Sequence, residues 1–139
     1  MSINQQTTAM EDIQGSTIDI AGSGDLRLVV GPKDKQITFL VFSSSVRLAS
    51  PVLNSMFDPG SRFMEGHSLD REFTFPEDDV SSFLILLRIV HIQFSKLPLV
   101  LSTEDLFNLA VFCDKYDAVS TVRPVSHLFE SFLTRHFLL

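Results

Sequence analysis

One stretch of the chain, residues 80–92, is apolar on nearly every side when it is placed on a helix. Its two apolar faces are Val80, Phe83, Leu84, Leu87 and Val90, and Ile85, Leu86, Ile89 and Ile92. A helix that is hydrophobic all round must be covered by other elements. Glu77, Asp78 and Asp79 precede it, where negative charge complements the helix dipole. The stretch therefore predicts a central, buried helix around which the rest of the domain packs.

Other stretches of β-branched and aromatic residues predict strands beside this helix. Residues 26–30 and 37–42 are separated by a turn at 31–35 and are typical of a hairpin. Residues 72–75 predict a third strand, and residues 17–20 alternate and could add a short edge strand.

The clearest helix start lies at Ser50 and Pro51. A serine hydroxyl can accept a bond from an unpaired backbone N–H at a helix start, and proline fits the first turn. Leu53, Met56 and Phe57 then fall at i, i+3 and i+4 and form one apolar stripe. We expect a short capped helix that packs against the core.

Three more helices are expected at residues 43–49, at 102–116 and from 119 onward. The order of elements predicts an α+β domain with a small three- to four-stranded sheet packed against five or six helices. We assign residues 17–139 to this domain, including a C-terminal helix. Residues 1–16 are polar, with few large apolar side chains, and are expected to form a disordered arm.

Composition and charge argue against several classes of protein. The 139 residues carry a net charge of −6 with a pI near 5.0, whereas nucleic-acid binding needs clustered Lys and Arg. The longest apolar run, from Phe83 to Phe94, carries Arg88 and His91 and is too short to span a bilayer. With Cys113 as the one cysteine, we expect the protein inside the cell, in the cytoplasm or the nucleus. Nucleic acid and membrane are not expected partners.

The sequence offers little for catalysis or metal binding. Cys113 lies on an apolar helix face, which favours a buried small hydrophobe over a reactive thiol. The four histidines show no ligand spacing, and no Gly-x-Ser-x-Gly elbow is present. We therefore expect a protein that is not an enzyme and needs no metal or cofactor. Arg88 is expected to pair with one of Glu77, Asp78 or Asp79, with snorkelling or an interface contact as the alternatives.

The order and spacing of these elements resemble a BTB/POZ domain of the variety common in fungal proteins. The likeness spans Ile18 to Phe132, and its strongest piece is the motif at 114–117. The matching residues are Gly24–Gly31, Phe39, Val41, Ser50–Leu53, Met56, Phe57, Phe63–Gly66, Phe75–Asp79, Phe83–His91, Leu109–Val111 and Asp114–Asp117. The resemblance implies a non-enzymatic module that binds proteins, often a second copy of itself.

The resemblance also draws attention to Asp25. In metazoan relatives an acid at this position joins a basic residue in a charged pocket at the dimer seam. The nearby strand usually ends in Val-His followed by Lys or Arg, whereas this chain reads Val41-Phe42-Ser43. Because a buried, unpaired acid would be costly, we expect Asp25 to face water or to accept bonds from backbone N–H groups. We expect Phe42 to offer an apolar contact instead. A simple turn residue is the alternative role for Asp25.

These observations give one expected function and one alternative. We expect protein–protein interaction, through self-association or scaffolding, with candidate partner-binding residues Asp25, Phe42, Ser43, Phe63 and Met64. The alternative is a substrate adaptor of a cullin-type ubiquitin ligase, which would add a cullin to the partners. The motif at 114–117 could be a recognition patch, although we favour a solvated helix end with Tyr116 packed inward.

Overall fold

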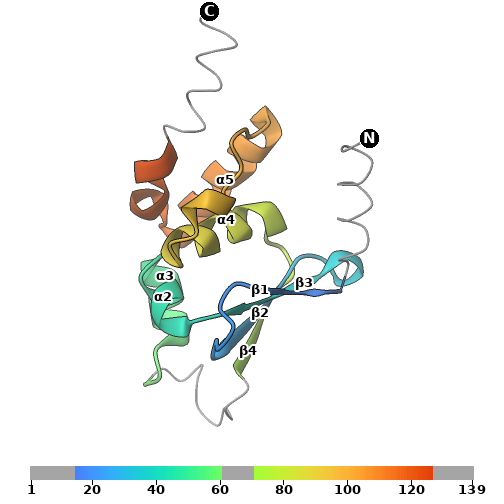
Figure 1. The fold of residues 1–139 in the computed structure, drawn as a ribbon, viewed down its shortest axis with the longest axis vertical. Helices are drawn as coiled ribbons and strands as arrows, with labels where there is room; N and C mark the ends of the chain where they lie inside the picture. The colour runs from blue at the N-terminus through green and yellow to red at the C-terminus, as the bar shows by residue number, and fades with distance from the viewer. Residues whose placement is uncertain (1–14, 61–70, 127–139) are drawn as a thin grey trace, which may run out of the picture.

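The computed structural model describes residues 15–60 and 71–126, which are drawn in colour in Figure 1. These residues form an α+β domain with one four-stranded sheet, as the sequence predicts. Most of the predicted N-terminal arm (residues 1–14), the loop with Phe63 and Met64, and the C-terminal residues 127–139 lie outside the described residues.

The sheet is mixed and has the strand order β1-β3-β2-β4. The strands β2 (Leu26–Val30) and β3 (Ile37–Val41) form the predicted antiparallel hairpin around a 3-10 turn, η1 (Lys33–Lys35). The outer strands β1 (Thr17–Asp19) and β4 (Arg71–Phe75) pair in parallel with β3 and β2, respectively. The short edge strand and the third predicted strand are therefore both confirmed.

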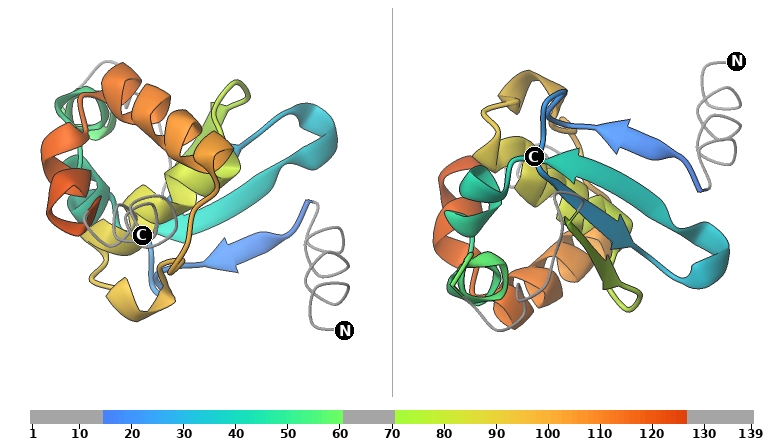
Figure 2. Two further views of the ribbon diagram at one scale, coloured as in Figure 1. Left: turned by 90° about the horizontal axis from the view of Figure 1, so that it is seen from above. Right: turned by 90° about the horizontal axis from the view of Figure 1, so that it is seen from below.

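The helix α4 lies next to the sheet and α5 lies beyond α4, while α2 and α3 lie at one end of the sheet (Figure 1). Their bounds are α2 (Ser43–Arg47), α3 (Pro51–Phe57), α4 (Val80–Val90), the 3-10 turn η3 (Phe94–Lys96) and α5 (Thr103–Tyr116). A further helix occupies residues 119–126. Both views in Figure 2 place the β2–β3 turn at the end of the sheet that lies farthest from α2 and α3.

Side-chain caps fix the starts of three helices. The Ser50 hydroxyl accepts a bond of 3.1 Å from the backbone N–H of Leu53, as predicted. Asp79 caps α4 by accepting a 3.0 Å bond from Ser82 N–H. Ser102 caps α5 in the same way. Each cap satisfies a backbone donor that has no partner inside its own helix, so local sequence sets where these helices begin.

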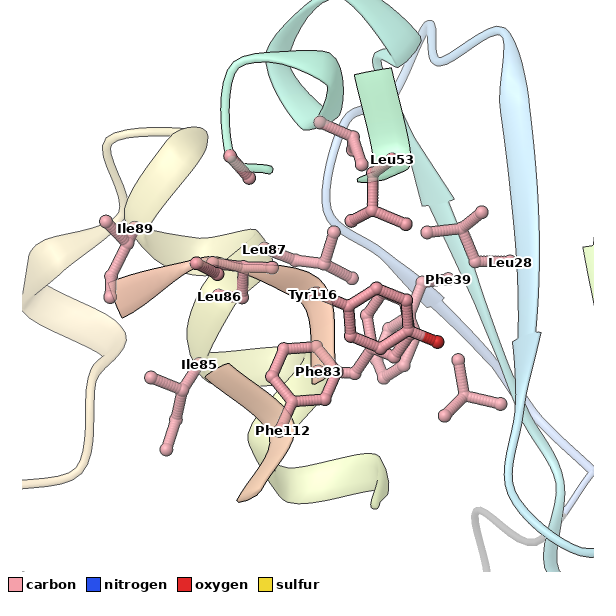
Figure 3. Packing of buried hydrophobic residues seen from close by; sticks show 14 of the residues in the cluster. Leu28, Phe39, Leu53, Phe83, Ile85, Leu86, Leu87, Ile89, Phe112 and Tyr116 are labelled. Carbon is pink, nitrogen blue, oxygen red and sulfur yellow. The ribbon is translucent and has the colours of Figure 1, made fainter. Parts of the chain in front are cut away.

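The core lies between the sheet and α4 (Figure 3). Alternate residues of β2 and β3 are buried, as expected for strands with one covered face. Of the eleven residues of α4, only Ser81 is exposed, which confirms the predicted central helix. The predicted length was wrong, because α4 ends at Val90 and Ile92 lies outside it with its side chain 73% exposed. The helix ends at Val90 because Ile92 has a positive φ of 60°, which a continuing α-helix does not allow.

Candidate functional site

Three polar side chains from distant parts of the chain meet at one end of the sheet. The Asp25 carboxylate accepts bonds of 2.7 Å from the Ser43 backbone N–H and 2.6 Å from the Ser43 hydroxyl. Arg71 Nη2 donates to the same carboxylate at 2.6 Å and to the Ser43 hydroxyl oxygen at 2.8 Å. The result is a closed triangle of an acid, a hydroxyl and a guanidinium.

The strand register creates this triangle. Leu26 lies opposite Val41 across the antiparallel pair and opposite Arg71 across the parallel pair. Asp25, just before β2, is thereby held beside the start of β4 and beside the first residue of α2. The positions of these side chains follow from the sheet topology and not from any local motif.

The hydrogen bonds outweigh the effect of burial on Asp25. Partial burial by itself would raise the pKa of the Asp25 carboxyl, but the bonds from Ser43 and Arg71 stabilise the charged form, so the pKa lies below its ordinary value. The side chain of Arg71 is 15% exposed and that of Asp25 is 49% exposed. Asp25 is thus charged at neutral pH and reachable from solvent.

The predicted absence of a basic partner for Asp25 was wrong. The sequence argument searched the residues directly after β3, where Phe42 and Ser43 stand. The structure supplies the positive charge from β4 instead, through Arg71, 46 residues from Asp25. The expected bond to a backbone N–H is confirmed, since Ser43 provides one. Nothing in the spacing of Asp25 and Arg71 reveals their contact, because it requires knowledge that β2 and β4 are neighbours.

We expect Asp25→Asn to lower the free energy of unfolding by about 0.5–1.5 kcal/mol at neutral pH, because the charged bond to Arg71 is lost. The pKa of Asp25 is lower in the folded state than in the unfolded state. Its contribution to the free energy of unfolding is therefore present above the unfolded-state pKa, about 4, and is lost as the pH falls below it. Urea denaturation at several pH values measures the difference from wild type, with exposed Asp114→Asn as the control. A difference that persists unchanged at about pH 2 would contradict this assignment.

Phe42 lies against a histidine from the end of α4. Its backbone N–H donates to Nε2 of His91 at 3.1 Å, and the two rings stack with centroids 6.1 Å apart. Because a backbone N–H can only donate, Nε2 must accept, and the proton of the neutral ring lies on Nδ1. Nδ1 then donates to the carbonyl of Leu87 at 2.7 Å. His91 therefore connects α4 to the junction of β3 and α2.

The residue after His91 has an unfavourable backbone conformation. Ile92 has φ of +60°, in the left-handed region. Its N–H bonds the carbonyl of Ile89 at 3.1 Å, and Gln93 N–H bonds the carbonyl of Arg88 at 2.8 Å. These two bonds define a Schellman motif, which usually places glycine where Ile92 stands. A β-branched side chain in this conformation is a genuine outlier.

Apolar side chains are exposed in this turn and at Phe42, the residue before Ser43 of the Asp25 triangle. Ile92 is 73% exposed, Phe94 47% and Phe42 37%. Between Ile92 and Phe94, the Gln93 amide donates to the carbonyl of Ile20 at 2.8 Å and fixes the turn against the residues after β1. We call Phe42, whose ring stacks on His91, together with Ile92 and Phe94 of the turn that follows His91, the His91 patch.

A second polar cluster, around Asp78, is buried. Asp78 accepts a 2.7 Å bond from Lys115 Nζ and a short bond from the Tyr116 hydroxyl. The Tyr116 carbonyl in turn accepts a 2.5 Å bond from the Ser50 hydroxyl. The inward packing of Tyr116 is confirmed, but Lys115 is not simply solvated as predicted. This cluster joins α5 to the start of α4 and to α3, which is a structural role.

Arg88 forms no ion pair with Glu77, Asp78 or Asp79, so the predicted ion pair was wrong. Its Nη1 donates to the carbonyl of Lys96 at 2.8 Å, and burial lowers its pKa. Its Nε is buried, and no hydrogen-bond partner for it lies among the residues that the structure describes. Asp78 faces Lys115 and Asp79 caps α4, so both are engaged elsewhere. Arg88 instead holds η3 against α4.

Cys113 is buried, as expected for a small hydrophobe. Residues 15–60 and 71–126 contain no cluster of three or more possible metal ligands. No helix in these ranges is long and apolar enough to cross a bilayer.

Neither a protein-family model nor a curated protein matches the chain at significant similarity.

Proposed function

We propose that this chain is a non-enzymatic protein-interaction module that self-associates through the His91 patch. The single observation that carries the proposal is the backbone conformation of Ile92. An l-residue with a side chain in the left-handed region costs about 1–2 kcal/mol, and a glycine would avoid this cost. Ile92 is largely exposed, so burial within its own domain does not offset it. Burial against a second molecule would.

The surroundings of Ile92 support the same proposal. Phe42 and Phe94 add aromatic surface, which is enriched in protein interfaces. Asp25, Ser43 and Arg71 form a polar group that begins at the residue after Phe42. An apolar centre with a polar rim is the usual arrangement of a protein interface. The resemblance to BTB/POZ domains, which often bind a second copy, favours self-association over other partners.

We expect Ile92→Asn to prevent association without weakening the fold. Asparagine tolerates the left-handed conformation, so the free energy of unfolding should stay the same or rise by about 1 kcal/mol. The same change removes the most exposed apolar side chain of the patch. Light scattering over a concentration series should show a mass that increases for the wild type and remains that of a monomer for the variant.

The control is Phe107→Gln, which removes an apolar side chain of similar exposure from α5. This variant should associate like the wild type. If the wild type is itself monomeric at high micromolar concentration, or if both variants associate normally, the proposal is wrong. Capture of a cullin by a chain that remains monomeric would favour the alternative function, a cullin-ligase adaptor.

A further inference from the structure

The side chain of His91 contacts two backbone groups, and both contacts require a neutral ring. Its Nε2 accepts a 3.1 Å bond from the Phe42 N–H, and its Nδ1 donates to the Leu87 carbonyl at 2.7 Å. A protonated imidazole carries a hydrogen on both nitrogens and has no acceptor left. A second proton on His91 would therefore place two donors against each other, and the bond that joins α4 to the residue after β3 would break.

The same proton would place a positive charge inside the His91 patch. The Phe42 ring stacks on the imidazole with centroids 6.1 Å apart, and Ile92 is the next residue along the chain. No carboxylate in the described part of the chain forms an ion pair with His91. Asp25, which accepts a bond from the residue after Phe42, is already paired with Arg71. An interface formed by the patch would therefore bury a charge without a partner, which is costly.

We infer that protonation of His91 releases the second copy, so that the His91 patch associates at neutral pH and separates in mildly acidic solution. This inference rests on the proposed self-association and adds its regulation. Histidine is the side chain whose ordinary titration falls between about pH 5 and 8, and His91 is the only histidine that the structure describes. The charged residues at the nearby ends of the surrounding elements are of types that keep their charge in this range. They are Asp19, Asp25, Arg47, Arg71, Arg88 and Lys96.

The Phe42 amide tests the contact without requiring association. In dilute, monomeric protein, its hydrogen exchange is measured at about pH 7.5 and about pH 5.5, relative to the Val46 amide in the same sample. The Val46 N–H is bonded to the Phe42 carbonyl and not to a side chain, so the ratio of the two rates removes the general effect of pH on exchange. The fraction of chains with the His91 contact open should rise from about one-tenth to about nine-tenths between these pH values. The relative rate of Phe42 should therefore rise about tenfold in acid, whereas His91→Gln, whose amide oxygen can accept at both pH values, should show no rise.

Association is tested by light scattering over a concentration series at the same two pH values. A pair of copies contains two His91 rings, each of which contributes about tenfold, so the dissociation constant of the wild type should increase about a hundredfold in acid. His91→Gln should associate equally at both pH values. This variant is a matched control, because it retains the other three histidines, His67, His127 and His136.

The outcomes separate this inference from the proposed function. If the wild type associates equally at both pH values, or if His91→Gln loses association in acid as the wild type does, protonation of His91 does not control the patch and this inference alone is wrong. An unchanged relative exchange rate of Phe42 would overturn it too. A wild type that is monomeric at neutral pH would overturn the proposed function and this inference with it.

Discussion

Phe83→Ala should lower the free energy of unfolding by about 3–5 kcal/mol. Phe83 is fully buried and lies at the centre of an aromatic cluster that joins three elements (Figure 3). Its ring centroid is 5.0 Å from Phe75 of β4, 5.0 Å from Phe112 of α5 and 6.0 Å from Tyr116 of α5. Removing the ring leaves a cavity whose walls belong to different elements, so the site cannot easily collapse.

Urea denaturation measures this loss as a lower midpoint at unchanged m-value. Phe107→Ala is the matched control, because Phe107 of α5 is also a helical phenylalanine but is 67% exposed. It should change stability by less than about 0.5 kcal/mol. A loss below about 1 kcal/mol for Phe83→Ala would contradict its place at the centre of the core.

The second large effect is expected at alkaline pH and comes from Tyr116. Burial, followed by the hydrogen bond and charge of Asp78, raises the pKa of the Tyr116 phenol far above its ordinary value. A group whose pKa is raised by folding stabilises the folded state fully at pH values below its unfolded-state pKa, which is about 10 for tyrosine. This contribution to stability is lost as the pH rises above that value. The protein should therefore lose stability steeply above about pH 10.

This loss can be followed at a single residue. Tyr116 is the only tyrosine and the chain has no tryptophan, so phenolate absorbance reports it alone and should appear together with unfolding. Tyr116→Phe should cost about 1–3 kcal/mol at neutral pH, since buried Asp78 loses a donor. Its stability should then depend less on pH in the alkaline range. Reversible ionisation of Tyr116 in the folded protein near pH 10 would refute the proposed environment.

Features with local causes could be predicted from the sequence. The start of α3 depends on one hydroxyl and one proline at adjacent positions, and both Ser50 and Pro51 act as expected. The buried position of α4 follows from its own side chains, because a helix without a polar face has no side to leave in water. The β2–β3 hairpin follows from two strands separated by a short turn.

Features that require two distant segments could not be predicted. Arg71 reaches Asp25 only because β4 lies parallel to β2, and no residue pattern specifies that neighbour. Asp78 binds Lys115 of α5, whereas Arg88 lies in the last turn of α4, at the far end of the helix from Asp78. Ile92 is different, because its local sequence argues against the conformation that it adopts. A helical sequence pattern does not indicate where a Schellman motif ends the helix unless a glycine stands at that position.

The parallel pairing of β2 with β4 has a consequence for how the chain folds. Of the pairs in this sheet, only the β2–β3 hairpin joins strands that are consecutive in the sequence. Before β4 can pair with β2, the chain must close a loop of more than forty residues. Loop closure costs entropy before any contact repays it, so such pairings slow folding. Until β4 arrives, one edge of β2 offers unpaired N–H and C=O groups and a row of apolar side chains. A nascent chain in this state can pair with another chain's strand, so the time needed to place β4 sets the interval during which this protein is exposed to aggregation.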